Sequence, residues 1–386
     1  MKIVVAMDSF KGSLTSLEAG EAVRRGVMAA FPDATVTVRA LADGGEGTAE
    51  AIVSALGGEM IEREVTGPLG APVTAKYGYL PARETAVIEM AEAAGLPLVP
   101  PEARDPLYTT TYGVGELILD ALDRGCRRFL VGLGGSATND GGVGMLSALG
   151  ISFLNAEGVP IPRGAIGLRD LASIDTAKAD GRLWECTFTV ACDVKNPLCG
   201  EEGCSRIFAP QKGGTEETIP QMDLWLRRYA DLTCATLGRD AAKALGAGAA
   251  GGMGFAFLAY LSATLTPGID LVTHEIGLDD DMEGACLVIT GEGRLDGQSA
   301  MGKTPVGVAA LAKRRGIPTL ALAGCVGEGA FLLHEAGIDA YFPILQGPMT
   351  LKEAMDGPTA QNALAATAEQ ACRLFAVGTQ SNRVQE

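Results

Sequence analysis

A glycine-rich segment at residues 132–144, GLGGSATNDGGVG, carries residue types that bind phosphate. Glycine lets the backbone approach an anion closely, and the serine and threonine can donate hydroxyl hydrogen bonds. The asparagine and Asp140 offer oxygen ligands of the kind that Mg²⁺ takes together with phosphate. The alternative is a tight turn whose Asn-Asp pair caps the following helix. We favour phosphate binding, because six glycines in thirteen residues exceed what one turn needs. The candidate ligands are Gly134, Gly135, Ser136, Thr138 and Asn139.

A second phosphate pattern, GxxxxGK[ST], spans residues 297–304 as GQSAMGKT. A true P-loop follows directly on a strand, so that its amides converge on the phosphate. Here the strand CLVIT is expected to end near Thr290, with the six residues GEGRLD before Gly297, and no downstream strand ends in the aspartate of a Walker B motif. We therefore interpret the segment as a turn at a helix start, in which Lys303 meets a phosphate as a point charge.

Four further polar segments follow apolar ones and offer groups for a small anion or a metal. DSFKGS suits a carboxylate or a phosphate, ADGGEGT suits metal or hydroxyl contacts, and GEGRLD is an acid–base–acid cluster for a polar anion. ACDVKNPLCG adds another acid and a lysine. Each alone fits a structural turn equally well, but together they indicate a site. Their polar residues include Asp8, Ser9, Lys11, Asp43, Glu46, Asp193, Glu292, Arg294 and Asp296.

Apolar strands alternate with glycine-rich loops and amphipathic helices at both ends of the chain. KIVVAM and TVTVRAL near the start, and CLVIT, PTLALAG and AYFPI near the end, each precede a polar loop and a helical pattern. This alternation predicts an α/β fold with a parallel sheet, in which ligands bind at the carboxyl ends of the strands. The middle opens with strand-like alternation, which indicates an antiparallel or mixed sheet. We predict one domain from residues 1–59 and 284–386, a second α/β domain, 60–283, inserted into it, and a cleft between them.

Composition and charge exclude several functional classes. The 386 residues carry a net charge of -16, which argues against nucleic acid as a partner, because such binding comes mainly from Lys and Arg. With only two histidines, acid–base chemistry falls to carboxylates and lysines rather than to a Ser-His-Asp triad. Residues 244–269 lack charge, but their glycine-rich first half indicates a turn feeding a buried helix and not a membrane span. Nine cysteines, without a CxxC pattern or a secretion signal, indicate reduced thiols and a cytoplasmic protein.

Taken in order, these segments resemble the glycerate kinases of the bacterial type-1 family. The motifs are DSFKGSL, ADGGEGT, YGVGELI, GLGGSATNDGG, ACDVKNPLCG, PQKG, GAAGGMG and ITGEGRLDGQSAMGK, and they span nearly the whole chain. The resemblance implies ATP-dependent phosphorylation of D-glycerate, typically at the 2-hydroxyl, giving 2-phosphoglycerate and ADP. It also implies a Rossmann- or flavodoxin-like domain built from both chain ends, an inserted α/β domain, and an active site between them.

A kinase of a small hydroxy acid needs Mg²⁺ and basic groups to neutralise charge, and a carboxylate near the attacking hydroxyl. Loop position assigns the expected roles as hypotheses. We expect Asp193 or Asp296 to act as the base or as a metal ligand, and Asp43 and Asp140 to bind Mg²⁺. We expect the glycerate ligands among Asp8, Ser9, Lys11 and Arg294, and the ATP ligands to include Lys303 with the glycine-rich segment.

Several alternatives stay open. The GLGGSA loop is similar to the GLGSSA loop of galactokinase-like (GHMP) kinases, which would place another hydroxylated acid in the site. A glycerate kinase that forms 3-phosphoglycerate would share these motifs, because the outcome depends on how glycerate is rotated. A hinged protein that only binds a hydroxy acid is separated from a kinase by ATP turnover. A nicotinamide-dependent oxidoreductase is disfavoured, because no GxGxxG follows the first strand. Both a monomer and a homodimer are compatible with the sequence.

Overall fold

The structure, a computed structural model, describes residues 1–383 and divides the chain into two compact units. Unit 1 comprises Met1–Asp43 and the chain from Val272 onwards, and unit 2 comprises Gly44–Leu271. These boundaries lie before the expected 59/60 and 283/284. The first differs because helix α2 (Thr48–Leu56) packs on strands of unit 2 and not on the sheet of unit 1.

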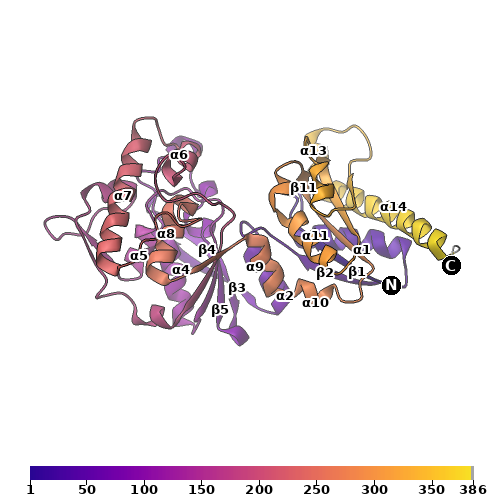
Figure 1. Cartoon of the computed structure of the whole chain (residues 1–386), viewed down its shortest axis with the longest axis horizontal. Coiled ribbons are helices and arrows are strands. Elements are labelled where there is room, and N and C mark those ends of the chain that lie inside the picture. Colours follow the sequence, from indigo (N-terminus) through magenta and orange to yellow (C-terminus); the bar gives the residue numbers. More distant parts are fainter. Residues whose placement is uncertain (384–386) are drawn as a thin grey trace. The chain divides into compact units, whose positions relative to one another are not determined.

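Both chain ends supply the elements of unit 1 (Figure 1). Its strands are β1 (Lys2–Met7), β2 (Thr35–Ala40), β11 (Leu287–Leu295), β12 (Thr319–Val326) and β13 (Ala340–Pro343). Its helices are α1 (Ser16–Ala30), α10 (Leu278–Asp281), η7 (Ser299–Met301), α11 (Thr304–Arg314), α12 (Leu332–Glu335), α13 (Leu351–Ala354) and α14 (Gly357–Arg383), while α9 (Gly268–Glu275) crosses the boundary.

The sheet of unit 1 is entirely parallel, in the order β13-β12-β11-β1-β2. Counted along unit 1, this is the flavodoxin-like order 2-1-3-4-5, which confirms the predicted fold class. In such sheets the strand order reverses between the first and third strands, and ligands bind beyond the carboxyl ends at that point. Here the reversal lies between β1 and β11, which pair from Ile3 and Leu287 to Met7 and Gly291.

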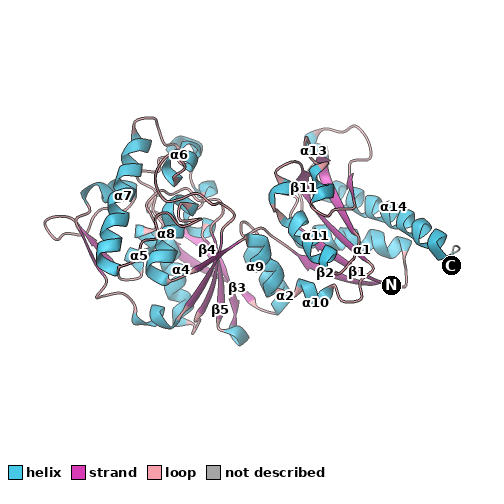
Figure 2. Cartoon of the chain, in the orientation of Figure 1, coloured by secondary structure: helices cyan, strands magenta, loops and turns pink. Residues whose placement is uncertain are grey.

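Helices cover both faces of this sheet, because its strands are apolar on both sides. α1 and α14 pack on one face (Figure 2), and α11 and α12 on the other. α1 begins at a capping box in which Thr15 and Glu18 satisfy each other's backbone amides. Its Gly26 allows the close approach of α14, since a Cβ there would fall on the carbonyl oxygen of Ala365.

β11 is longer than the sequence suggested. The expected end near Thr290 was wrong, because the strand continues through GEGRL to Leu295. The extension is held by β12, with Arg294 opposite Cys325 and Leu295 opposite Val326. Glu292 therefore lies on the strand and not in the loop that follows it.

Unit 2 contains the remaining elements. Its strands are β3 (Glu59–Thr66), β4 (Pro72–Leu80), β5 (Thr85–Glu89), β6 (Arg128–Gly132), β7 (Ser152–Leu154), β8 (Ser173–Asp175), β9 (Thr187–Ala191) and β10 (Thr264–Thr266). Its helices besides α2 are η1 (Pro81–Arg83), α3 (Ala91–Ala94), η2 (Leu96–Leu98), η3 (Pro101–Ala103), α4 (Tyr112–Asp123), α5 (Val143–Ala148), η4 (Ala165–Asp170), η5 (Gly181–Glu185), α6 (Cys204–Phe208), η6 (Pro210–Lys212), α7 (Thr218–Leu237) and α8 (Ala249–Leu261).

The main sheet of unit 2 is mixed, as predicted for the middle of the chain. Its order is β10-β9-β6-β5-β4-β3, with β3, β4 and β5 antiparallel and the others parallel. The carboxyl ends of β5, β6, β9 and β10 therefore meet at one edge. A separate hairpin-like pair, β7 and β8, lies apart from this sheet.

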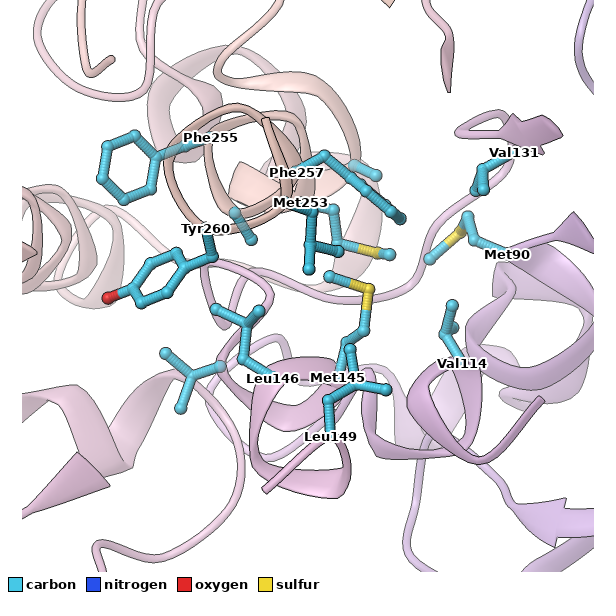
Figure 3. Close-up of a cluster of buried hydrophobic side chains, with 14 of the residues drawn as sticks. Met90, Val114, Val131, Met145, Leu146, Leu149, Met253, Phe255, Phe257 and Tyr260 are labelled. Carbon is cyan, nitrogen blue, oxygen red and sulfur yellow. The ribbon is translucent and has the colours of Figure 1, made fainter. Parts of the chain in front are cut away.

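The uncharged segment 244–269 forms a turn and the buried helix α8, as expected from its composition. Figure 3 shows α8 side chains, Met253 and Phe255 among them, gathered with Met145 and Leu146 of α5 in the apolar core. Within residues 1–383 no helix is both long enough and apolar enough to cross a bilayer.

Three residues near the start of α8, 250–252, are in left-handed conformation, and the middle one, Gly251 (φ 65°), is expected to tolerate no side chain. A Cβ at Gly251 would fall on the carbonyl oxygen of Thr138. We expect Gly251→Ala to cost ~3 kcal/mol, from overpacking together with backbone strain, and to lower the thermal midpoint by several degrees. Gly125→Ala is the matched control, because Gly125 (φ 89°) has open space around it and pays the strain alone, ~1 kcal/mol. Equal shifts in the two variants would contradict this packing.

Candidate functional site

Asp8 marks the reversal point of the unit 1 sheet, directly after β1. Its amide donates to the carbonyl of Gly291 on the neighbouring β11 at 2.9 Å. One carboxylate oxygen accepts from the Thr304 hydroxyl at 2.6 Å and the other from the Ser9 amide at 2.6 Å. Only 7% of the residue is exposed, and burial raises the pKa of the Asp8 carboxyl. Asp8 thus joins the ends of β1 and β11 to the start of α11.

Glu292 lies on the neighbouring strand at the same edge. Its Oε1 atom is buried and has no hydrogen-bond partner among the residues that the structure describes. Burial raises the pKa of Glu292 to about 7, while Ser299 and Lys303 act in the opposite direction and the negative charges of Asp8 and Asp43 add to the rise. A carboxyl group with a pKa near neutrality and a free oxygen is suited to accept a proton.

Glu292 should also make the folded protein less stable as pH rises. The pKa of Glu292 in the folded protein is about 7, above the ordinary value of 4.5. The folded state therefore loses stability as pH rises from 4.5 to 7, and above pH 7 the loss is complete. We expect Glu292→Gln to raise stability by up to ~3 kcal/mol at pH 8 and by nothing below pH 4.5. Thermal unfolding of both proteins in EDTA, across this range, measures the difference. A gain that is independent of pH would contradict it.

Asp43, three residues after the end of β2, is the third acid of the group that Asp8 and Glu292 form. It is half-buried, and it makes no hydrogen bond or ion pair within the described part of the chain. Its charge contributes to the raised pKa of both Asp8 and Glu292. Its oxygens are therefore available to a ligand. In residues 1–383 no group of three or more His, Cys, Asp or Glu side chains is arranged to hold a metal ion by itself.

Positive charge lies beside these acids. The charge of Lys11 acts to lower the pKa of Asp8, and the charge of Lys303 acts to lower the pKa of Glu292. Neither lysine makes an ion pair with another described residue, so both remain available to an anion. Arg294 instead pairs with Asp296 at 3.0 Å. Asp296 also accepts from the Gln298 amide at 2.9 Å, and these contacts hold the pKa of its carboxyl below the usual range.

The segment 297–304 has more of a P-loop context than the sequence suggested. Because β11 ends at Leu295, only Asp296 separates the strand from Gly297, and α11 begins at Thr304. The Thr304 hydroxyl meets Asp8 at the end of the adjacent strand. However, the segment forms the short helix η7, in which the Ser299 amide donates to the Asp296 carbonyl and the Met301 amide to the Gln298 carbonyl, both at 3.0 Å. These amides do not converge on a common point outside the loop.

The glycine-rich segment follows β6 at the corresponding edge of unit 2. Gly134 and Gly135 are exposed, whereas Thr138 and Asn139 are fully buried. The Asn139 side chain donates from Nδ2 to the Ser205 hydroxyl at 2.8 Å. Of the expected phosphate ligands, the structure therefore presents the backbone of the two glycines, with Ser136 next to them at 8% exposure.

Asp140 is fully buried, and its carboxylate accepts four hydrogen bonds. The donors are the Thr111 amide and hydroxyl, both at 2.9 Å, and the amides of Gly142 at 3.0 Å and Gly144 at 3.2 Å. This pattern is that of a residue that fixes a turn. Since both oxygens are occupied, the carboxylate does not fit a Mg²⁺ ligand.

Asp193 follows β9, the strand next to β6, and is exposed at the same edge as the glycine-rich segment. One of its oxygens accepts from the Gly268 amide at 2.9 Å. The candidate residues thus form two groups, one at the edge of each unit's sheet. Unit 1 holds Asp8, Ser9, Lys11, Asp43, Arg294, Asp296 and Lys303, and unit 2 holds Gly134, Gly135, Ser136, Thr138, Asn139, Asp140 and Asp193.

Two polar residues in these groups were not singled out from the sequence. Thr304 was noted only as part of the GK[ST] pattern, and its partner Asp8 is 296 positions away. Lys212, in the PQKG motif, is buried beneath the glycine-rich segment and donates to the Ser136 hydroxyl at 2.7 Å. Both contacts are distant in sequence, so no local pattern reveals them.

Comparison with known proteins gives consistent matches along the chain. A profile of the glycerate kinase family matches residues 3–376. The glycerate 2-kinase of Escherichia coli K12 is 48% identical over 92% of this chain and 94% of its own. A glycerate kinase of Haemophilus influenzae is 48% identical over 97% of this chain and 99% of its own. The crystal structure of a protein assigned as glycerate kinase 2 from Salmonella typhimurium LT2 has a TM-score of 0.90 and 47% identity, covering 98% of this chain and 99% of that one.

Proposed function

The chain belongs to the glycerate kinase family, and we propose that it transfers the γ-phosphoryl group of ATP to the 2-hydroxyl of D-glycerate with Glu292 as the base. The observation that carries this assignment is the unit 1 edge. There, at the reversal point of a flavodoxin-like sheet, the half-buried Glu292 has a buried oxygen without a partner among the described residues. It lies among acids and near Lys303, which forms no ion pair with any residue that the structure describes. The alternatives of a binding protein and an oxidoreductase are disfavoured by family membership.

Glycerate binding is assigned to the cationic groups of unit 1. Lys11 is exposed and unpaired among the described residues, so it can hold the glycerate carboxylate as a point charge, with the Ser9 hydroxyl beside it. Arg294 can join them if it gives up its ion pair with Asp296. The Arg294 side chain is exposed, and ion pairs at the surface are weak. Asp8 is mostly buried and anchored to Thr304, so we assign it to positioning Ser9 and α11.

Glu292 is assigned as the base in preference to the expected Asp296 and Asp193. Asp296 already accepts from Arg294 and Gln298, and its lowered pKa makes it a poor proton acceptor. Asp193 is exposed and stays a prediction as a ligand of the metal. As the 2-oxygen of glycerate bonds to the γ-phosphorus, its proton passes to Glu292 and the bond from that phosphorus to the ADP oxygen breaks.

ATP binding is assigned to the glycine-rich segment of unit 2. The exposed backbone of Gly134 and Gly135, with the Ser136 hydroxyl, would contact phosphate oxygens. Lys303, in unit 1, stays a prediction as a point charge for phosphate. Mg²⁺, when bound, neutralises developing charge on the transferred phosphoryl group. Asp43 fits as its ligand because its oxygens are free, and one or two carboxylates with phosphate oxygens are what Mg²⁺ takes. Cytoplasmic location and a homodimer stay predictions.

The acceptor specificity tests this function. Purified protein is given Mg-ATP with D-glycerate, tartronate, lactate or glycerol, and ADP release is followed. We expect turnover with D-glycerate, and none with glycerol, which lacks the carboxylate, or with lactate, which lacks the 3-hydroxyl. Absence of turnover with every acceptor, from a folded protein that binds ATP, would exclude the proposal. Faster turnover with lactate would show that the 3-hydroxyl is not recognised.

A further inference from the structure

Lys212 is a lysine buried in unit 2, which is a costly arrangement for a charged group. It ends η6, and only 2% of it is exposed. Its ammonium group donates to the Ser136 hydroxyl and to the Thr138 carbonyl, both at 2.7 Å. It makes no ion pair with any described residue. Burial lowers the pKa of Lys212 to about 8, while Cys204 and Asp140 act in the opposite direction.

The shape of the glycine-rich segment does not require this charge. Neutral hydrogen bonds already hold the segment from several sides. They are Leu96 N to Gly135 O at 2.8 Å, Ala137 N to Ala94 O at 2.9 Å, Thr109 Oγ1 to Ala137 O at 2.9 Å and Gly141 N to Gly251 O at 2.9 Å. The Asp140 carboxylate accepts four more, from the Gly142 and Gly144 amides within the segment and from the amide and hydroxyl of Thr111 outside it. A methionine in place of Lys212 would fill similar space without the cost of burying an ammonium group, although it would leave the Thr138 carbonyl without this donor.

The contact with Ser136 has a chemical consequence. Because the Ser136 oxygen accepts from Lys212, its own proton must point away from the ammonium group. Ser136 is slightly exposed and directly follows the exposed glycines 134 and 135. A hydroxyl that accepts from a cation is polarised and becomes a better donor. Its proton is therefore suited to a phosphate oxygen.

We propose that Lys212 is a positioning residue for ATP, which directs the Ser136 hydroxyl outwards and places positive charge beneath the backbone that meets the phosphates. This inference rests on the proposed role of the glycine-rich segment in binding ATP. Lys212 does not itself touch the nucleotide. It acts through Ser136, so its effect is on ATP affinity and not on glycerate affinity.

The test compares Lys212→Met with Ser136→Ala and the double variant in the full-length protein. We expect each single change to raise the KM for ATP about tenfold, and to raise the Kd for ADP, measured by calorimetry, by the same factor. About tenfold is the loss of affinity expected when one charge-assisted hydrogen bond is removed. The KM for glycerate should not change. The double variant should be no weaker than Lys212→Met alone, because one residue acts through the other.

Thr233→Val is the control for destabilisation alone. Thr233 is buried elsewhere in unit 2, where its hydroxyl bonds to Tyr229 and Tyr260. It should lower the thermal midpoint and leave ADP affinity unchanged, whereas Lys212→Met should weaken ADP binding about tenfold whether or not its midpoint falls. A Lys212→Met protein with a lowered midpoint and normal ADP affinity would show a purely structural lysine. If that variant does not fold, normal ADP affinity in Ser136→Ala overturns the proposal equally. In each case wild-type turnover of glycerate tests the proposed function separately.

Discussion

Replacement of Glu292 by glutamine is expected to lower kcat by about 10³-fold, within the 10²–10⁴ range of general-base contributions. Glutamine preserves the shape of the side chain but cannot accept the hydroxyl proton. The KM values for ATP and D-glycerate should change little, because Glu292 is assigned to proton transfer and not to holding either ligand. Initial rates of ADP release at saturating Mg-ATP and D-glycerate measure the effect.

Glu89→Gln is the matched control for this variant. Burial raises the pKa of Glu89 to about 7, as for Glu292, but Glu89 accepts from the Ala49 and Gly47 amides and lies in unit 2. It serves the start of α2, and kcat should stay within a few-fold of the wild type. If Glu292→Gln kept kcat within about tenfold, the base would have to be sought among the remaining acids, Asp193 first.

Replacement of Asp43 by asparagine is expected to raise the Mg²⁺ concentration that gives half-maximal activity by about 100-fold. The change removes one negative charge from an oxygen assigned to the metal. Part of the rate should return at high Mg²⁺, because the phosphate oxygens remain as ligands. The measurement is a Mg²⁺ titration of ADP release at constant free ATP, with EDTA-treated protein as the starting point.

Asp33→Asn makes the same change of charge in unit 1 at an exposed position after α1. Its Mg²⁺ dependence should match the wild type, which separates a local ligand from a general effect of net charge. An Asp43→Asn protein with an unchanged Mg²⁺ midpoint would remove Asp43 from the metal site. Asp140 is not an alternative, because its oxygens are already occupied by four donors.

The alternation of strands, loops and helices predicts the fold because it is a local signal. Strand β1 lies where KIVVAM indicates, and α1 begins at the Thr15 and Glu18 capping box. The end of β11 could not be predicted in the same way. Its last residues, GEGRL, have the glycine and charge content of a loop, and only pairing with β12 makes them a strand. Glu292, expected in a loop, therefore lies near the carboxyl end of β11.

The polar segments of the candidate site could be predicted from the sequence, but the roles of their residues could not. Polar residues after strands identified Asp8, Asp43 and the glycine-rich segment. Burial, which decides their roles, depends on contacts that are remote in sequence. The bond from Thr304 to Asp8 spans 296 positions, and the one from Lys212 to Ser136 spans 76. Both Glu292 and Lys212 are ionisable groups that burial disfavours in the charged form, and such exceptions to folding rules are expected where function requires them.

The central claim, transfer of phosphate to the 2-hydroxyl of D-glycerate, is tested most directly by proton-coupled phosphorus NMR of the product. Protein, Mg-ATP and D-glycerate are mixed, and the new phosphomonoester signal is followed as ADP appears. A phosphate on carbon 2 couples to a single methine proton and gives a doublet, which is the result we predict. A triplet would show coupling to the methylene protons of carbon 3 and transfer to the other hydroxyl. No glycerate-dependent signal would contradict the kinase assignment itself.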